Sequence, residues 1–364
     1  MKRILCLSDG LKQGGAERQL IGLAHLLQKK GYDVTLACYT EGVFYDDIIN
    51  AYSINYKQLK PNATMFSKIY CVYTFIKENN YDCIIAYKDG ATIISCLLKL
   101  LGLKFKLIVS ERNTTQQLTR REKVKFWFYR FADYIVPNSH SQKKIILTYY
   151  PLYEKTLQVI TNFTDTEVFK PANDFEEKNN DYGINILTVA RVAVQKNILN
   201  YLQAIKVLHD KGIRLQVKWI GDISVGQDEY FNECMRYIEQ NKMSDYFSFE
   251  SAKSNIKDEY EACDVFCLPS LYEGFPNVLC EAMACGKPVL CSDVCDNPYI
   301  VNDCINGFLF SPTNVIDIVQ KFEKICNKSI CERKKMGDYS RQIILEKCSE
   351  EAFVTKYINL IGKK

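Results

Sequence analysis

The sequence predicts an α/β protein built from two doubly wound domains, each a parallel sheet with helices on both faces. With 364 residues the chain is too long for one ordinary core and comfortable for two. Short apolar runs alternate with longer amphipathic stretches, which is typical of parallel sheets covered by helices. This alternation pauses once, in the polar segment 171–183, and then resumes. Domains of this kind bind ligands at the carboxyl ends of their strands, so we expect the two to face a central cleft.

The first half of the chain opens with an apolar strand followed by a helical pattern over 16–31. Leu20, Leu23, Ala24 and Leu27 form one apolar face of this helix, and Gly31 ends it. The other strands of this half are further short apolar runs. The five predicted strands are 3–8, 33–39, 83–87, 106–111 and 134–139.

The second half repeats the pattern, with predicted helices over 197–212 and 229–243. We expect an N-terminal domain over 1–165 and a C-terminal domain over 166–349. A last helix, about 350–364, is expected to pack back on the first domain. The predicted strands of this half are 184–191, 216–222, 246–251, 264–270 and 288–293.

The composition excludes several classes of protein. No apolar run approaches the roughly 18 residues of a membrane-spanning helix, and the first residues predict a buried strand rather than a secretory signal. The sixteen cysteines are scattered and form no CxxC pair, so we expect small buried hydrophobic side chains in a reducing cytoplasm. None of the three histidines has a second candidate ligand nearby, so no metal site is expected. The cysteines inside apolar runs are Cys6, Cys38, Cys83, Cys96, Cys267 and Cys291.

Charge is distributed unevenly along the chain. Residues 1–172 carry 24 Lys and Arg against 15 Asp and Glu, whereas residues 173–364 carry 23 against 28. A basic first half indicates an anionic partner, for which phosphate, lipid head groups and nucleic acid are all candidates. No nucleic-acid-binding motif is present, and acidic residues interrupt the basic ones, so we expect no nucleic-acid partner.

Three segments at predicted strand ends carry candidate chemistry. The first follows the strand 3–8, where Gly14 and Gly15 open a helix and let backbone amides approach an anion. Its spacing matches neither GxGxxG nor GxxxxGK[ST], and a plain strand-to-helix turn explains it equally well. The second follows the strand 184–191, where Arg191 and Lys196 can converge on a diphosphate; the alternative is a solvated basic pair.

The third segment, 268–289, has the most specific pattern. A strand leads into a loop with Glu273 and Gly274, and Pro276 suits the first position of a short helix that ends at Gly286. Glu281 lies about one and a half turns into that helix, where it can bind a polyol such as ribose, while Glu273 lies nearer the reacting end. The backbone amides expected to face the cleft are those of Gly274, Phe275, Asn277 and Val278.

The spacing Glu-x7-Glu in EGFPNVLCEAMACGKPV resembles the signature of glycosyltransferase family 4, a retaining family with the GT-B fold. GGAER at 14–18 and the pair Arg191 and Lys196 fall where that family has its amino-terminal loop and its diphosphate clamp. The segment 160–171 resembles the family's interdomain hinge, with Asn162 and Asp165 matching and Phe163 where a glycine is common. The resemblance spans nearly the whole chain, with four motifs in the same order.

The resemblance implies that the N-terminal domain, 1–165, binds the acceptor and the C-terminal domain, 166–349, binds the donor. It also implies roles for these residues. Glu281 would bind the ribose of the donor and Glu273 its sugar ring, while Arg191 and Lys196 would neutralise the departing nucleotide diphosphate. Gly14 and Gly15 would let the first domain close on the phosphates. Family members retain the anomeric configuration and need no metal, and this chain has no DxD motif. We therefore expect no cofactor, and a nucleotide-sugar donor, a UDP-sugar in the first place, as a substrate.

One position departs from the family pattern. Many members have a histidine after the strand that is KLIVSE here, whereas this chain continues with Glu111, Arg112 and Asn113. Such an ERN sequence resembles a subset of bacterial enzymes that build surface polysaccharides or lipid-linked oligosaccharides. Glu111 is a candidate to orient an acceptor hydroxyl, and Arg112 a candidate to meet an acceptor phosphate. The resemblance favours a glycan or polyprenyl-linked acceptor.

The segment 114–134 that follows is a candidate membrane contact. At helical spacing, an apolar stripe is predicted to face the core and leaves Phe126 and Tyr129 among lysines and arginines on the outer side. A solvated basic helix is the alternative. The protein is then expected in the cytoplasm, at the inner face of the cell membrane. The stripe comprises Val124, Phe128, Phe131 and Ile135.

Two other hypotheses compete with a sugar transferase. One is another GT-B enzyme, of nucleotide-sugar epimerase or synthase type, and the other is a two-domain protein that binds a ligand without catalysis. The presence of Glu273, Glu281, Arg191 and Lys196 in one chain favours an active transferase. No motif specifies the donor sugar, the linkage or the oligomeric state.

Overall fold

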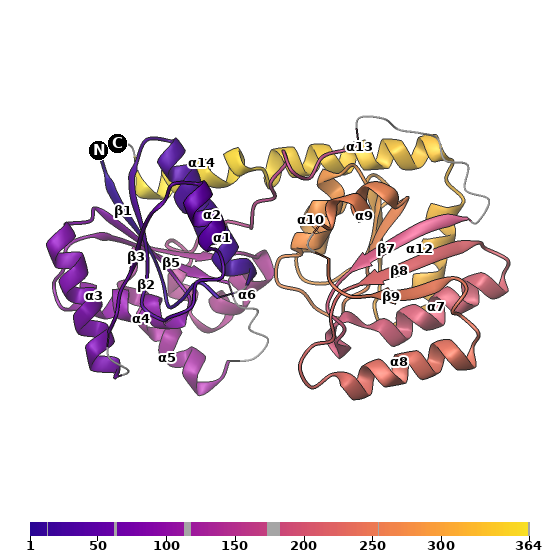
Figure 1. Ribbon diagram of the computed structural model, residues 1–364, viewed down its shortest axis with the longest axis horizontal. Coiled ribbons are helices and arrows are strands. Elements are labelled where there is room, and N and C mark those ends of the chain that lie inside the picture. Colours follow the sequence, from indigo (N-terminus) through magenta and orange to yellow (C-terminus); the bar gives the residue numbers. More distant parts are fainter. Residues whose placement is uncertain (13, 62–63, 113–117, 173–182, 254, 363–364) are drawn as a thin grey trace. The chain divides into compact units, whose positions relative to one another are not determined.

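The computed structural model describes residues 1–12, 14–61, 64–112, 118–172, 183–253 and 255–362 (Figure 1). The chain forms two compact units. The first consists of Met1–Asn162 together with Glu350–Lys364, and the second of Phe163–Ser349. Each unit contains one parallel six-stranded sheet, so the predicted pair of doubly wound α/β domains is confirmed.

The first sheet has the strand order β3-β2-β1-β4-β5-β6. Because strands are added on one side of β1 and then on the other, the order switches direction between β1 and β4, where α/β sheets bind ligands. The elements of this unit are β1 (Arg3–Ser8), α1 (Gly15–Lys29), β2 (Asp33–Cys38), α2 (Asp46–Ala51), β3 (Asn55–Gln58), α3 (Met65–Asn79), β4 (Cys83–Tyr87), α4 (Asp89–Leu100), β5 (Lys106–Glu111), α5 (Arg120–Phe128), the 3-10 turn Tyr129–Phe131, β6 (Tyr134–Pro137), α6 (His140–Tyr149), the 3-10 turn Pro151–Tyr153 and α14 (Glu350–Ile361).

The second sheet has the order β12-β11-β10-β7-β8-β9, which is the same topology with its switch between β7 and β10. Its elements are β7 (Ile184–Val189), the 3-10 turn Val194–Lys196, α7 (Ile198–Asp210), β8 (Leu215–Ile220), α8 (Asp228–Gln240), β9 (Phe247–Glu250), α9 (Lys257–Ala262), β10 (Val265–Leu268), α10 (Asn277–Ala284), β11 (Val289–Ser292), α11 (Asn297–Ile300), β12 (Gly307–Phe310), α12 (Val315–Cys326) and α13 (Ile330–Lys347).

All ten predicted strands are present, and the two that the sequence analysis missed, β3 and β12, are edge strands. The side chains of β3 (NYKQ) are polar and exposed or half-buried, so they lack an apolar signal. The strand β12 has only four residues and begins at a glycine. Edge strands bury less surface than central strands, which explains the weak pattern.

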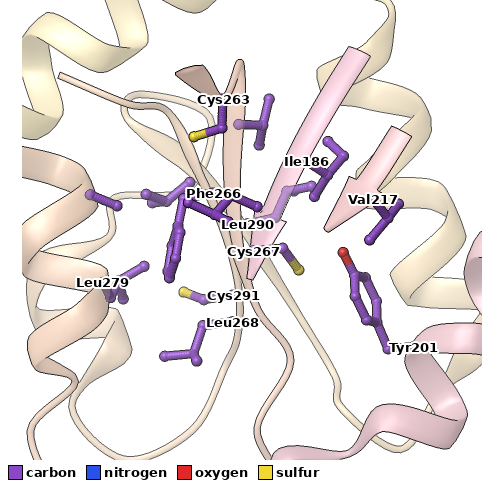
Figure 2. Packing of buried hydrophobic residues seen from close by; sticks show 14 of the residues in the cluster. Ile186, Tyr201, Val217, Cys263, Phe266, Cys267, Leu268, Leu279, Leu290 and Cys291 are labelled. Carbon is purple, nitrogen blue, oxygen red and sulfur yellow. The ribbon is translucent and has the colours of Figure 1, made fainter. Parts of the chain in front are cut away.

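The core of the second unit shows why its strands are continuous apolar runs (Figure 2). Phe266 and Cys267 from β10 and Leu290 and Cys291 from β11 are fully buried between the helices, because a parallel sheet is covered on both faces. All sixteen cysteines lie among the described residues and none forms a disulfide. The six cysteines that the sequence placed in apolar strands are buried, which confirms their role as small hydrophobic side chains.

Helix α14 belongs to the first unit although it ends the sequence. The ammonium groups of Lys2 and Lys106 both donate hydrogen bonds to the carbonyl of Ile361, at 3.3 and 3.1 Å. Two cations therefore lie at the negative end of the helix dipole. Tyr357 of this helix is buried against Tyr87 of β4, with 3.0 Å between the two hydroxyls. Among the helices of the described residues, none is long and apolar enough to cross a membrane.

Candidate active site

The candidate donor site lies at the carboxyl edge of the second sheet, on both sides of the switch point. The loop after β7 and the loop after β10 are tied together there. The amide of Leu271 donates to the carbonyl of Gln195 at 2.8 Å, and the side chain of Gln195 donates to the carbonyl of Tyr272 at 2.8 Å. Asn197, whose backbone is left-handed, donates from its side chain to the carbonyl of Pro269 at 3.0 Å. The two loops are therefore fixed relative to each other.

Lys196 and Glu273 meet directly across these two loops. The Lys196 ammonium lies 2.6 Å from Oε1 of Glu273, and the Ser270 hydroxyl donates to the same oxygen at 2.5 Å. Both charged side chains are about nine-tenths buried, which strengthens their attraction relative to a surface pair. Within the described residues, Oε2 of Glu273 has no hydrogen-bond partner.

Arg191, the other predicted cation, is exposed at the end of β7. Its guanidinium makes no hydrogen bond or ion pair with any described residue. The structure thus brings Lys196 to Glu273 rather than to Arg191, and leaves Arg191 available to an anion.

Glu281 lies on α10 with its side chain turned into the second unit. It is buried, and its Oε2 accepts a hydrogen bond from the Tyr260 hydroxyl at 3.1 Å. Burial and the neighbouring Glu281 carboxylate hold the pKa of Tyr260 well above its usual value, so this hydroxyl stays a donor. Just beyond the end of α10, α13 packs closely on the chain: a Cβ at Gly337 would lie 1.9 Å from the carbonyl oxygen of Gly286.

The start of α10 differs in one detail from the prediction. Pro276 is the N-cap, and the helix begins at Asn277. The Asn277 amide donates to the carbonyl of Phe275 at 3.0 Å, so it is engaged in the turn rather than free for a ligand. In the described part of the chain, the amides of Gly274, Phe275 and Val278 have no acceptor. Three of the four predicted amides therefore remain available.

In the first unit, Gly14 is the N-cap of α1 and Gly15 its first residue. The Gly14 amide donates to the Tyr45 hydroxyl at 3.1 Å, and that hydroxyl donates to the Gly14 carbonyl at 2.9 Å. The expectation that the Gly14 amide is open to phosphate is therefore wrong in this structure. A side chain at position 14 would collide with the buried carboxylate of Glu17, which pairs with Lys88. A larger residue at position 14 would therefore have to displace the Glu17 carboxylate.

Glu111 ends β5 and is sealed inside the first unit. Its Oε2 accepts hydrogen bonds from the Lys125 ammonium at 2.7 Å and the Tyr129 hydroxyl at 2.8 Å, and all three side chains are buried. Lys125 also lies 3.1 Å from Asp89 at the start of α4. Burial lowers the pKa of Lys125, but Glu111 and Asp89 outweigh this and raise it. Glu111 therefore joins β5 to α5, which argues against its predicted contact with an acceptor hydroxyl.

Arg112 uses all its donors inside the first unit. Nε donates to Ser110 at 2.7 Å, Nη1 to Asn162 at 2.8 Å and to the carbonyl of Ile160 at 3.4 Å. Nη2 donates to the hydroxyls of Tyr87 and Tyr357 at 2.7 and 2.6 Å. A guanidinium has five N–H groups, so none is left for an acceptor phosphate, and that prediction is corrected. Asn113, the third predicted acceptor residue, lies outside the described residues, as do residues 114–117.

The face assignment of the segment that follows was wrong in part: Phe128, Phe131 and Ile135 of the predicted stripe do pack on the core. Phe126 and Tyr129 are buried, whereas Val124, predicted to face the core, is 55% exposed. The helical period does not continue to Ile135, because α5 ends at Phe128, a 3-10 turn follows, and Ile135 already lies in β6. Pairing of Lys125 with Glu111 turns this side of α5 inward.

Some residues of the site carried no signal in the sequence. Ser270 was within the third motif, yet nothing in a single sequence shows which hydroxyl contacts a carboxylate three residues on. Cys295, after β11, accepts a hydrogen bond from the Glu273 amide at 3.4 Å. Within the described ranges, no group of three or more His, Cys, Asp or Glu side chains is arranged to hold a metal ion.

Two known protein families match this chain, one in each half of the sequence. The model described as Glycosyltransferase Family 4 matches residues 13–168, and that described as Glycosyl transferases group 1 matches residues 169–343. The chain belongs to glycosyltransferase family 4. It is a glycosyltransferase with the GT-B fold, as the resemblance of its motifs implied.

Bacterial relatives match this glycosyltransferase over most of its length. The chain is 25% identical over 362 residues to the amylovoran biosynthesis glycosyltransferase AmsD of Erwinia amylovora, covering 96% of this chain and 99% of that protein. It is 26% identical to a Campylobacter jejuni enzyme, covering 90% of this chain and 89% of that protein. That enzyme is named GalNAc-α-(1→4)-GalNAc-α-(1→3)-diNAcBac-PP-undecaprenol α-1,4-N-acetyl-D-galactosaminyltransferase. Among solved structures, Anabaena Alr3699/HepE in complex with UDP has a TM-score of 0.85 at 18% identity, covering 99% of each chain.

Proposed function

We propose that this glycosyltransferase moves a hexosyl group from a UDP-sugar to a glycan acceptor, with retention of configuration and without a metal ion. The observation that carries the proposal is the Lys196–Glu273 pair at the switch point of the second sheet, with one Glu273 oxygen unpartnered among the described residues. The UDP complex of the Anabaena neighbour and the α-linkage in the name of the Campylobacter relative support this choice of donor and stereochemistry.

Each polar group then has a role in donor binding. Glu281, held by Tyr260, binds the ribose, and Glu273 binds the sugar ring. Arg191 meets the diphosphate as it departs. Lys196 contributes as well, because an ammonium has three donors and the ion pair with Glu273 uses one. Fixed cations at a leaving diphosphate stabilise the charge that develops as the glycosidic bond breaks.

The proposed acceptor is a glycan carried on a polyprenyl diphosphate, in the synthesis of a surface polysaccharide or oligosaccharide. The Campylobacter relative is named for such an acceptor. An acceptor of this kind is presented at a lipid surface, so we place the protein on the inner face of the cell membrane, as a peripheral protein without a nucleic-acid partner.

Exposed apolar side chains on the first unit support this membrane contact. On α5, Val124 and Trp127 are exposed, and Trp127 stacks with the Arg130 guanidinium at 4.6 Å. On α3, Phe66 is 86% exposed and Tyr70 is also exposed. Both helices pack against α4, so they belong to one layer of the unit. Aromatic side chains beside cations suit a lipid–water interface.

Co-sedimentation with vesicles containing anionic lipid tests the membrane contact. The double variant Phe66→Ser/Trp127→Ser should bind such vesicles at least several-fold more weakly than the native protein. Tyr339→Ser removes an exposed aromatic from α13 of the other unit and serves as the matched control. Equal binding by all three proteins would exclude this surface.

Calorimetric titration with UDP, GDP and ADP, with and without a chelator, tests the donor assignment. We expect UDP to bind in both conditions, and Glu281→Ala to weaken it about tenfold, the effect of one lost charge-assisted hydrogen bond. Binding of none of the three nucleotides would contradict the proposal and favour a non-catalytic ligand-binding protein. Binding of UDP-sugar followed by its epimerisation, without transfer, would favour the other GT-B chemistry.

A further inference from the structure

The two carboxylate oxygens of Glu273 are in different environments. Oε1 accepts hydrogen bonds from both the Lys196 ammonium and the Ser270 hydroxyl, at 2.6 and 2.5 Å. Oε2 accepts none from the described residues. Two donors on one oxygen fix the rotation of the carboxylate, so that only Oε2 can accept a hydrogen bond from a substrate.

Ser270 differs from Lys196 in how firmly it is held. Lysine carries its charge on a flexible stem, and a pair with lysine alone leaves the orientation of a carboxylate loosely defined. Ser270 is fully buried at the end of β10, and its side chain has one rotatable bond to the hydroxyl. Ser270 therefore fixes the orientation of the Glu273 carboxylate, which Lys196 alone would leave loosely defined.

A chain of buried polar groups fixes Ser270 in turn. The Ser292 hydroxyl, at the end of β11, donates to the carbonyl of Ser270 at 2.5 Å. The side chain of Asn297 donates to the carbonyl of Ser292 at 2.8 Å. Ser270, Ser292 and Asn297 are all fully buried. These bonds link α11 and β11 to the carboxylate of Glu273.

The backbone of Glu273 is held from the same side. Its amide donates to Sγ of Cys295 at 3.4 Å, and Cys295 has a left-handed backbone with φ of 50°. Non-glycine residues adopt this conformation only where the surrounding structure imposes it. The end of β11 thus contacts Ser270, the residue that orients the Glu273 carboxylate, and the loop after β11 contacts the peptide of Glu273.

We propose that Ser270 is a positioning residue that directs Oε2 of Glu273 to a hydroxyl of the donor sugar. The inference rests on the proposed function, since it takes the ligand to be a UDP-sugar. Ser270 acts through Glu273 and does not itself touch the substrate. Its loss should therefore weaken recognition of the sugar while leaving recognition of the nucleotide intact.

The test compares the affinities for UDP and for UDP-sugars, which requires no acceptor. Dissociation constants of UDP, UDP-glucose, UDP-galactose, UDP-GlcNAc and UDP-GalNAc are measured by calorimetry for the native protein and Ser270→Ala. We expect the native protein to prefer one UDP-sugar over UDP. In Ser270→Ala this preference should fall about tenfold, the effect of one misdirected charge-assisted bond, while UDP itself binds within twofold of native.

Further variants separate positioning from a general structural role. Ser270→Thr keeps the hydroxyl and should restore the preference. In a Glu273→Gln background, Ser270→Ala should have little further effect, because the two residues act as one unit. Ser340→Ala is the matched control, since Ser340 is a fully buried serine of the same unit that donates to the carbonyl of Asn306 at 3.2 Å.

The outcomes are distinguishable. If the native protein binds no UDP, the proposed function fails, and the inference fails with it. If the native protein prefers one UDP-sugar and Ser270→Ala keeps that preference, or loses UDP binding to the same extent, only the inference is overturned. If Ser270→Ala does not fold, Ser270→Cys replaces it: the thiol is a weaker donor, so a reduced preference supports the inference and a native one overturns it.

Discussion

The two sheets share one strand order, yet the glutamate–lysine pairs at their carboxyl edges are built in opposite ways. In the first unit, Glu111 and Lys125 are buried and have Tyr129 and Asp89 as further partners; we call them the sealed pair. In the second unit, Glu273 and Lys196 retain some exposure, and Oε2 of Glu273 is unpartnered among the described residues; we call them the open pair. The same two residue types therefore hold helices together in one unit and present an open oxygen in the other. An unfilled hydrogen-bonding position, rather than the charge pair itself, marks the candidate catalytic edge.

Breaking the sealed pair should have the largest effect on stability. Lys125→Met leaves the Glu111 carboxylate buried without its cation, which costs about 3–5 kcal/mol of the free energy of unfolding. Denaturant titration measures the loss. The double variant Lys125→Met/Glu111→Gln should recover part of it, because no uncompensated charge remains. A single variant of native stability would show that the pair does not hold α5 to β5.

Breaking the open pair should instead affect activity. Glu273→Gln keeps the size of the side chain but removes the charge that faces the donor sugar, and we expect roughly a 100-fold loss of sugar transfer. Turnover of the preferred UDP-sugar with a membrane-extracted acceptor measures it. The melting temperature should fall less than in Lys125→Met, since glutamine can still accept a hydrogen bond from Ser270 and Lys196 retains some exposure. A loss of folding rather than of transfer would contradict the contrast between the two pairs.

Arg112→Lys tests whether the arginine after β5 is structural. An ammonium cannot replace five donors in a planar fork, so at least one of Tyr87, Asn162 and Tyr357 loses its partner. We expect a loss of about 1–3 kcal/mol in unfolding free energy, with UDP affinity unchanged. Weaker acceptor binding at native stability would return Arg112 to the acceptor site that its sequence suggested.

A surface pair, Lys328 and Glu332, provides the smallest effect. Hydrogen bonds from Lys328 and from the amide of Ser329 lower the pKa of Glu332, at the start of α13, to about 2. Because the folded pKa is depressed, the contribution of Glu332 is present above its usual pKa of 4.5 and lost as the pH falls toward 2. Chemical denaturation of native protein and Glu332→Gln should therefore differ slightly at pH 6 and converge at low pH. A difference that grows on acidification would reverse the assigned sign.

The fold could be predicted from the sequence because buried parallel strands are continuous apolar runs. The candidate site could be located because its motifs follow the ends of these strands. The sequence placed Arg191, Lys196 and Glu273 in the segments that follow strands, and Glu281 on the short helix after Glu273, where the structure has them. It failed where a partner comes from a distant segment: Tyr357 lies 245 positions from Arg112. It also failed where a period was extended too far, since α5 stops at Phe128 and the stripe predicted through Ile135 spans three different elements.

The position of α14 has a consequence for the order in which the protein can assemble during synthesis. Phe163–Ser349 is one continuous segment, so its folding does not require α14. The first unit, although translated first, lacks α14 until translation ends. Until then Arg112 cannot contact Tyr357, and Lys2 and Lys106 cannot contact the carbonyl of Ile361. The unit made first is thus the one completed last, and a purified chain truncated after Ser349 should contain a folded second unit and an unfinished first one.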